Sequence, residues 1–277
     1  MRTQPAWSDE TMNSISDLLT PAQLRRLERK NKKMNKNEQP IHEKTERHHQ
    51  SRVQQLRPIV PLNQKQQYLL DDLHDYDQVL VYGPAGTGKT HVTTTYAAQE
   101  FIKGNFDKII ITRPTVAIET SIGFFPGTLE EKMAVWLAET INILKQTLSP
   151  EGYGIALKNG DIEIVPFEVI RGRSLNKSII LLTEAQNTTV KEMAAFVTRT
   201  GQDSKVVIDG DIRQSDIGDK NGLVWALDMI DRNPGLAALS GMVEFDSNDI
   251  VRSGLCGAWV KAIEKQFSPK AEVVVSK

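Results

Sequence analysis

The segment that most constrains the fold is GPAGTGKT, residues 83–90, which follows the apolar run QVLVY and precedes a helix-like pattern. Its spacing is G-x-x-x-x-G-K-[ST], in the strand–loop–helix context in which that motif binds phosphate. Gly83, Gly86 and Gly88 allow a tight turn, so that successive amide N–H groups and the start of a helix face one anion. The residues expected to contact a nucleotide here are Gly83, Pro84, Ala85, Gly86, Thr87, Gly88, Lys89 and Thr90.

The last two residues of this loop have separate expected roles. Lys89 can reach the β- and γ-phosphates of a nucleotide, and the hydroxyl group of Thr90 can ligate Mg²⁺. The predicted ligands are therefore a nucleoside triphosphate, ATP, and Mg²⁺.

The rest of the chain alternates short apolar runs with amphipathic segments. Such a pattern predicts an α/β fold in which a mostly parallel sheet is covered by helices on both faces. The expected strands are 78–83, 108–112, 162–167, 178–182, 205–210 and 242–246. The clearest helical patterns are 91–104, 129–148 and 190–201.

A nucleotide hydrolase also needs a carboxylate on a strand beside the phosphate loop. The run SIILL ends at Thr183 and Glu184, where two acids would ordinarily stand together. Glu184 is the candidate general base, and Thr183 offers a weak, uncharged contact to Mg²⁺ through water. The alternative is that Glu184 only caps the next helix.

A further polar turn, DGDIRQ, follows the apolar run KVVI. Ligands of open α/β sheets collect at such strand ends, so Asp211 and Gln214 are expected near the γ-phosphate, with Asp211 contacting Mg²⁺ directly or through water. Asp209 or Asp211 can also supply the charge that Thr183 lacks. An ordinary Asp-Gly-Asp turn is the alternative.

Residues 1–57 differ from the remainder in charge and in apolar content. They hold 12 lysine and arginine residues against 7 acidic ones, whereas the remainder holds 22 against 28. We expect a basic extension that is partly disordered or helical, followed by one folded domain over 58–277. A nucleic-acid tail is the alternative for the extension. His42, His48 and His49 lack the companion ligands of a metal site.

The sequence also predicts where the protein works. It has no apolar run of 18 residues, no signal-peptide pattern at its N-terminus and a single cysteine, Cys256, which is expected to be a small core residue. These features favour the cytoplasm, or the host cytoplasm for a phage protein, without membrane contact.

Several ordered blocks carry a resemblance to a known family. They are NQKQQY, GPAGTGKT, ITRP, GFFPGTLEEKM, IRGRSLN, TEAQNTT, VTRTG, DGDIRQSD and NDIVRSG, spread over residues 58–265. Together they resemble the PhoH-like P-loop ATPases of bacteria and phages. The phosphate loop is shared by many families, whereas the combination of GFFPGTLEEK, RGRSLN and EAQNTT is much more specific.

This resemblance implies a RecA-like domain that binds and hydrolyses ATP and acts on RNA or DNA in the manner of a helicase. It implies that Gln64 reads the adenine, that Gln186 contacts the γ-phosphate beside the catalytic Glu184, and that Asp211 and Gln214 form a sensor. Arg252 is similar to an arginine finger, which would serve a neighbouring subunit if a homo-oligomeric ring such as a hexamer forms. A surface or capping arginine is the alternative for Arg252.

Thr183 departs from the pattern of the resembled family, which has Asp there. Loss of a carboxylate beside a metal commonly costs about 10–100-fold in metal affinity or activity. A slowly hydrolysing, nucleotide-gated binding or assembly protein is therefore an alternative to a motor on single-stranded RNA or DNA. A small-molecule kinase is a third reading, which the glutamate–glutamine pair and the Gly210–Gln214 block disfavour.

Nucleic-acid contacts are expected from basic and aromatic residues outside the phosphate loop. ITRP resembles the helicase segment that touches a nucleic-acid backbone, and Phe124 and Phe125 are candidates for base stacking, with burial of the pair as the alternative. The arginines expected to contact phosphates are Arg113, Arg171, Arg173 and Arg199.

Overall fold

The computed structural model describes residues 56–114, 129–173 and 175–267. The basic extension, the three histidines near residue 45 and the pair Phe124 and Phe125 lie outside this part, so the predictions on them stay predictions.

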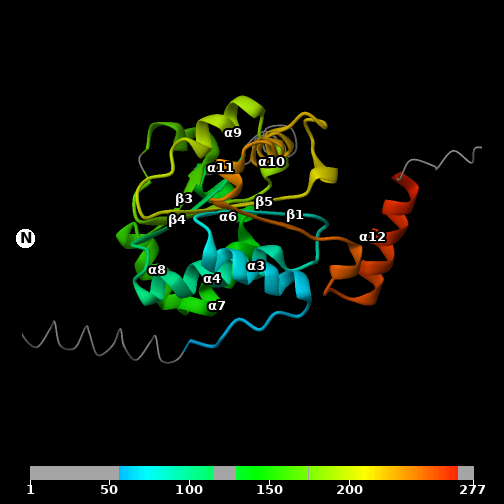
Figure 1. Cartoon of the computed structure of the whole chain (residues 1–277). Helices are drawn as coiled ribbons and strands as arrows, with labels where there is room; N and C mark the ends of the chain where they lie inside the picture. The colour runs from blue at the N-terminus through cyan, green and yellow to red at the C-terminus, as the bar shows by residue number, and fades with distance from the viewer. Residues whose placement is uncertain (1–55, 115–128, 174, 268–277) are drawn as a thin grey trace, which may run out of the picture. The chain divides into compact units, whose positions relative to one another are not determined.

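A six-stranded parallel sheet forms the centre of the described domain (Figure 1). Its spatial order is β3-β2-β4-β5-β1-β6, and each adjacent pair is parallel. The bounds are β1 Gln78–Tyr82, β2 Lys108–Arg113, β3 Ile162–Pro166, β4 Ser178–Leu182, β5 Lys205–Gly210 and β6 Ser240–Glu244. The predicted α/β fold class, with a mostly parallel sheet and helices on both faces, is confirmed.

Alternating strand residues build two apolar cores, one on each face of the sheet. Val79 and Val81 pack on one side, whereas Leu80 between them packs on the other, as the two-residue period of a strand requires. The first core is shared with α3 (Gln64–Asp75), α4 (Lys89–Lys103), α6 (Leu129–Trp136), α7 (Ala138–Leu148) and α8 (Pro150–Asn159). The second is shared with α9 (Val190–Val197) and α10 (Gly222–Arg232).

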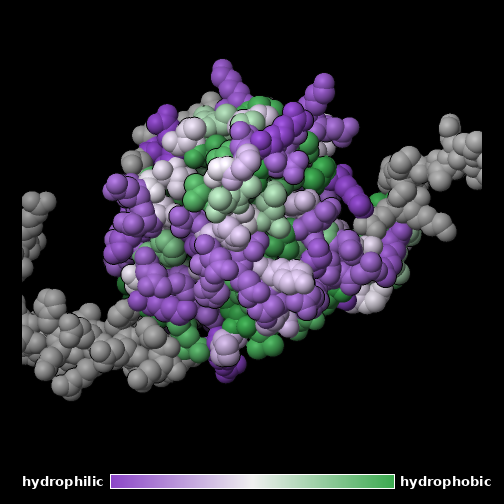
Figure 2. Space-filling view, viewed as in Figure 1, coloured by the Kyte–Doolittle hydropathy of each residue, from purple (hydrophilic) through white to green (hydrophobic). Residues whose placement is uncertain are grey.

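The outer surfaces of these helices are polar. Figure 2 shows hydrophilic residues over the region of α3 and α4, so each of these helices turns a polar face to solvent and an apolar face to the sheet. The short α11 (Pro234–Ala237) leads into β6, and α12 (Gly254–Phe267) follows the last strand. None of the described helices is long and apolar enough to cross a membrane.

Three local predictions differ from the structure. The pattern over 129–148 is not one helix, because it breaks at Leu137 between α6 and α7. The last strand begins at Ser240, two residues earlier than expected. The strand that leads to Glu184 is not the neighbour of the phosphate-loop strand either, because β5 lies between β4 and β1. Asp209, at the end of β5, is thereby brought directly beside β1.

Candidate functional site

The phosphate loop connects β1 to α4, and its glycines are required by its geometry. Gly83 has a φ of 132°, and a Cβ there would lie 2.2 Å from the carbonyl oxygen of Phe245. Gly88 caps α4 with a left-handed φ of 86°. Lys89 is buried, and its Nζ donates hydrogen bonds to the carbonyl oxygens of Gly83 at 2.8 Å and Pro84 at 3.0 Å. The ammonium group is thus held at the inner rim of the loop, where an anion would meet it.

Gln66 braces this loop from α3. Its side chain is buried, its Nε2 donates to the carbonyl oxygen of Thr87 at 2.9 Å, and its Oε1 accepts from the backbone N–H of Leu62. Gln64, for which adenine recognition was expected, is exposed on the same helix and is not among the residues that line the pocket. The glutamine that contacts the phosphate loop is therefore Gln66, which the sequence analysis did not single out.

Asp209 faces the first turn of α4. Its Oδ2 accepts a hydrogen bond of 2.9 Å from Oγ1 of Thr90, the hydroxyl group expected to ligate Mg²⁺. The residue is only 8% exposed, and this burial raises the pKa of its carboxyl group, against the opposing influence of Lys89 and of the Thr90 hydrogen bond. Nearby Glu184 and Glu139 raise that pKa further. Asp209 therefore needs a cation close by to stay ionised at low energetic cost.

The residues around Thr90 fit a magnesium ion. Mg²⁺ prefers oxygen ligands, and proteins usually bind it through one or two carboxylates together with substrate phosphates. Thr90 and Asp209 provide a hydroxyl and a carboxylate oxygen in direct contact. Nowhere in the described ranges do three metal-ligating side chains form a cluster, so the cation would depend on nucleotide phosphates for its remaining ligands.

Glu184 stands in the turn after β4 with an unusual backbone. Its φ of 56° lies in the left-handed region, which is strained for a residue with a side chain. Its Oε2 accepts from Nε2 of Gln186 at 2.6 Å, and its Oε1 lies 3.8 Å from Nη2 of Arg113. The carboxylate is therefore oriented from two sides and opens into the pocket.

Gln186 links the ends of β4 and β5. It is 1% exposed and does not line the pocket; besides its bond to Glu184, its Oε1 accepts the backbone N–H of Asp211 at 3.0 Å. The carboxyl group of Asp211 accepts from the backbone N–H of Arg213 and from Nε2 of Gln214. Burial raises the pKa of Asp211, and these hydrogen bonds oppose the rise. Gln186 thus orients Glu184 and the turn at Asp211 together.

Arg252 lies against the phosphate loop of its own chain. Val251 donates its backbone N–H to the carbonyl oxygen of Gly86 at 3.0 Å, and a Cβ on Gly86 would lie 3.1 Å from Cδ of Arg252. Nη2 of Arg252 is 3.6 Å from Oε1 of Glu139 across the pocket. The guanidinium group can therefore reach a nucleotide bound by the same chain.

Arg113, from the end of β2, belongs to this pocket too. It is 14% exposed, lies over the ring of Trp136 at 5.0 Å from the ring centroid, and donates to the carbonyl oxygen of Trp136. Arg113 was expected to contact nucleic acid, but its side chain is already engaged by Trp136 and lies beside Glu184. Among the other expected phosphate contacts, Arg173 pairs with Glu163 at 2.6 Å, Arg199 is exposed, and the side chain of Arg171 lies outside the described part.

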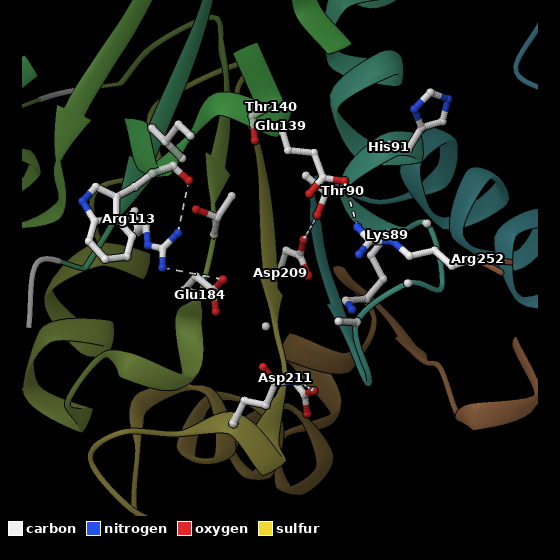
Figure 3. A pocket seen from close by; sticks show the side chains of 18 of the residues that line it. Lys89, Thr90, His91, Arg113, Glu139, Thr140, Glu184, Asp209, Asp211 and Arg252 are labelled. Atoms are coloured by element: carbon white, nitrogen blue, oxygen red, sulfur yellow. Dashed lines mark hydrogen bonds and ion pairs between the residues drawn. The ribbon is translucent and has the colours of Figure 1, made fainter. Parts of the chain in front are cut away.

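One cavity of about 320 Å³ brings these groups together (Figure 3). This volume is at the lower end of the range of small-molecule sites. Lys89 and Arg252 stand on one side of it, Glu184 and Arg113 on the other, and Asp209 between them (Figure 3). The predicted residues that line it are Ala85, Gly86, Gly88, Lys89, Thr90, Arg113, Thr183, Glu184, Asp209, Asp211, Gln214 and Arg252.

Comparison with known proteins gives one consistent family. The model of the family described as PhoH-like protein matches residues 58–264. A PhoH-like protein of Bacillus subtilis is 39% identical over 192 residues, which are 69% of this chain and 59% of the relative. Protein PhoH of Escherichia coli is 34% identical over 203 residues, which are 72% of this chain and 56% of that protein. The chain thus aligns with less than two thirds of these relatives' length.

Similarity to solved structures is weaker. The UvsW helicase of bacteriophage T4 superposes with a TM-score of 0.42 at 12% sequence identity, over 73% of this chain and 67% of that structure.

Proposed function

Since this chain belongs to the PhoH-like protein family, we propose that it binds ATP with Mg²⁺ and hydrolyses the γ-phosphate bond. One observation carries the proposal. Thr90 and Asp209 are in contact within the same cavity that the oriented carboxylate of Glu184 enters. A hydroxyl–carboxylate pair beside a phosphate loop and a carboxylate opposite to it are the two halves of a nucleotide-hydrolysis site.

In the proposed mechanism each group has one task. The loop amides and Lys89 hold the β- and γ-phosphates, and Glu184 accepts a proton from the attacking water. Gln186 keeps Glu184 pointed at that water, and Arg252 stabilises the charge that develops on the transferring phosphoryl group. Mg²⁺, held by Thr90 and a pocket carboxylate, would neutralise phosphate charge. Asp211 and Gln214 remain the proposed sensor of the γ-phosphate.

Three further parts of the proposal rest on the family resemblance alone. Gln64 reads adenine, single-stranded RNA or DNA is the partner, and copies of the chain assemble into a ring. The arginines of the described part support the nucleic-acid partner only weakly, because Arg113 and Arg173 are engaged within the chain. The slow-turnover alternative that Thr183 suggested is less favoured, since Asp209 provides a carboxylate beside Thr90.

The deciding experiment is the steady-state rate of Mg²⁺-dependent ATP hydrolysis by the purified chain, with and without single-stranded RNA and DNA. We expect Lys89→Ala to lose nucleotide binding and Glu184→Gln to keep binding while hydrolysis falls by about 10²-fold or more. Glu151→Gln on the exposed surface of α8 is the matched control and should leave both unchanged. Unaltered hydrolysis in Glu184→Gln would overturn the proposal. Stimulation by one kind of strand would identify the partner.

A further inference from the structure

Thr183 and Asp209 are neighbours across two parallel strands. Leu182, the last residue of β4, pairs with Ile208 of β5, so Thr183, which follows β4, stands beside Asp209 of β5. Both line the cavity. A side chain at either position can therefore serve the same region of the site.

The two side chains differ in what they offer a cation. The hydroxyl of Thr183 is turned toward the carbonyl oxygen of Thr112, 3.4 Å away, and it carries no charge. Asp209 directs Oδ2 at the hydroxyl of Thr90, and Figure 3 shows this contact near the middle of the cavity. The negative charge beside Thr90 thus comes from β5.

The other acids of the cavity are engaged elsewhere. Glu184 is held by Gln186 and Arg113, and Asp211 accepts from Gln214. Glu139 faces Arg252. Among the acids that line this cavity, Asp209 alone has a recorded contact with Thr90 within the described part of the chain.

Because Asp209 is buried, a nearby cation would stabilise its ionised carboxylate. A carboxylate taken out of water is costly unless it is paired, and the hydrogen bond from Thr90 is neutral. Lys89 also lines the cavity, but its ammonium is bonded to carbonyl oxygens of the phosphate loop. A divalent cation bound between Asp209, Thr90 and the phosphates of a nucleotide would satisfy the carboxylate and the hydroxyl at once.

We propose that Asp209 supplies the carboxylate for the Mg²⁺ of the bound nucleotide, in place of the acid that family resemblance expects at position 183. Thr183 stands directly after β4, and Asp209 stands beside it near the end of β5. This assignment rests on the proposed nucleotide site and names its metal ligand.

The test moves the carboxylate from position 209 to position 183. Four proteins are compared: wild type, Asp209→Thr, the double variant Thr183→Asp with Asp209→Thr, and Asp209→Asn, which keeps the shape and the hydrogen bond to Thr90 without the charge. Asp219→Thr, an exposed acid, is the control. Affinity for a fluorescent, non-hydrolysable ATP analogue is titrated in EDTA and in Mg²⁺, and bound Mn²⁺ is counted by electron paramagnetic resonance.

We expect Mg²⁺ to tighten binding of the analogue by the wild type and the control. In Asp209→Thr and Asp209→Asn, affinity in EDTA should stay equal or rise, and the enhancement by Mg²⁺ should fall by about 10–100-fold. The double variant should regain most of the enhancement and the bound Mn²⁺.

Full enhancement in both single variants would overturn the assignment of Asp209, and so would a double variant no better than Asp209→Thr. If the wild type binds no nucleotide, the proposed function itself fails and the metal assignment falls with it. If it binds nucleotide with a magnesium enhancement but hydrolyses none, the metal assignment is still decided by the four proteins.

Discussion

The side-chain amide of Gln186 lies 2.6 Å from Oε2 of Glu184 and bridges this carboxylate to the backbone N–H of Asp211. Gln186, which was expected to contact the γ-phosphate, holds the side chain of Glu184, which was expected to activate water. The link joins the ends of β4 and β5, so the orientation of Glu184 depends on both strands.

Gln186→Ala should therefore impair the chemical step and leave nucleotide binding nearly intact. Misplacement of a catalytic group by about 1 Å can cost about 10²-fold in rate, and we expect kcat to fall by this order with little change in KM. Steady-state kinetics check this, with Gln67→Ala, a half-buried glutamine that does not line the cavity, as control. A large rise in KM at constant kcat would instead support the direct phosphate contact implied by family resemblance.

Arg252 should act on the nucleotide of its own chain. It packs against Gly86 of the same phosphate loop, so Arg252→Ala should lower hydrolysis by about 10³-fold or more, as for other arginines that stabilise phosphoryl transfer. Arg252→Ala mixed with Lys89→Ala should then recover no activity, because neither chain holds a complete site. Recovery in the mixture would mean that the arginine serves a neighbouring subunit.

Two glutamines of α3 should separate stability from base recognition. Gln66→Ala leaves the buried carbonyl of Thr87 without its donor and should lower the free energy of unfolding by about 1–3 kcal/mol, measured with urea. Gln64→Ala, at an exposed position, should change that free energy by less than about 0.5 kcal/mol. If Gln64 reads adenine, its variant should lose preference for ATP over GTP; equal preference would refute that role.

Lys205 should make stability depend on pH in the alkaline range. It is buried and donates to the carbonyl oxygen of Tyr76; burial lowers its pKa, against the opposing effect of Asp77, Glu100 and Asp75. In the unfolded chain the pKa of lysine is about 10.4, and in the folded chain the pKa of Lys205 is lower. Between these two pKa values the unfolded chain binds more protons, so the contribution of Lys205 to the free energy of unfolding rises with pH. This contribution is lost as pH falls through the pKa of Lys205 in the folded chain.

Urea unfolding of the wild type and Lys205→Met from pH 7 to 10 measures this contribution. The wild type should gain stability relative to the variant as pH rises, by no more than about 1.4 kcal/mol per pH unit. Lys158→Met on the exposed face of α8 should show no such trend. A difference that is flat across the range would show that Lys205 titrates as it does in the unfolded chain.

The strands were predictable because their residues are apolar on both faces. The bounds of β4 and β5 match the sequence pattern, and the phosphate loop lies where its motif requires. The order of strands was not predictable, since pairing joins segments far apart in the chain. The resemblance of ITRP to a helicase segment assigned Arg113 to nucleic acid, and only the pairing of β2 with β4 places it beside Glu184.

The burial of Gln66, and not of Gln64, could have been predicted from helical spacing. Gln66 stands three, four and seven residues before Leu69, Leu70 and Leu73, all of which are buried. Asn63 caps the helix by accepting from the backbone N–H of Gln66, which fixes this phase. Gln64 lies off that stripe. The helical period thus predicts that Gln66 lies on the buried face, whereas adenine recognition by Gln64 stays a prediction.

The parallel register of β4 and β5 also bears on how such sites are found by searching. A search that reads letters along the chain counts an aspartate lost at position 183. A comparison of residues adjacent in space finds the carboxylate of Asp209 on the neighbouring strand, next to Thr183. If Asp209 holds the metal as proposed, a carboxylate 26 residues away in the chain replaces the one that the linear motif expects.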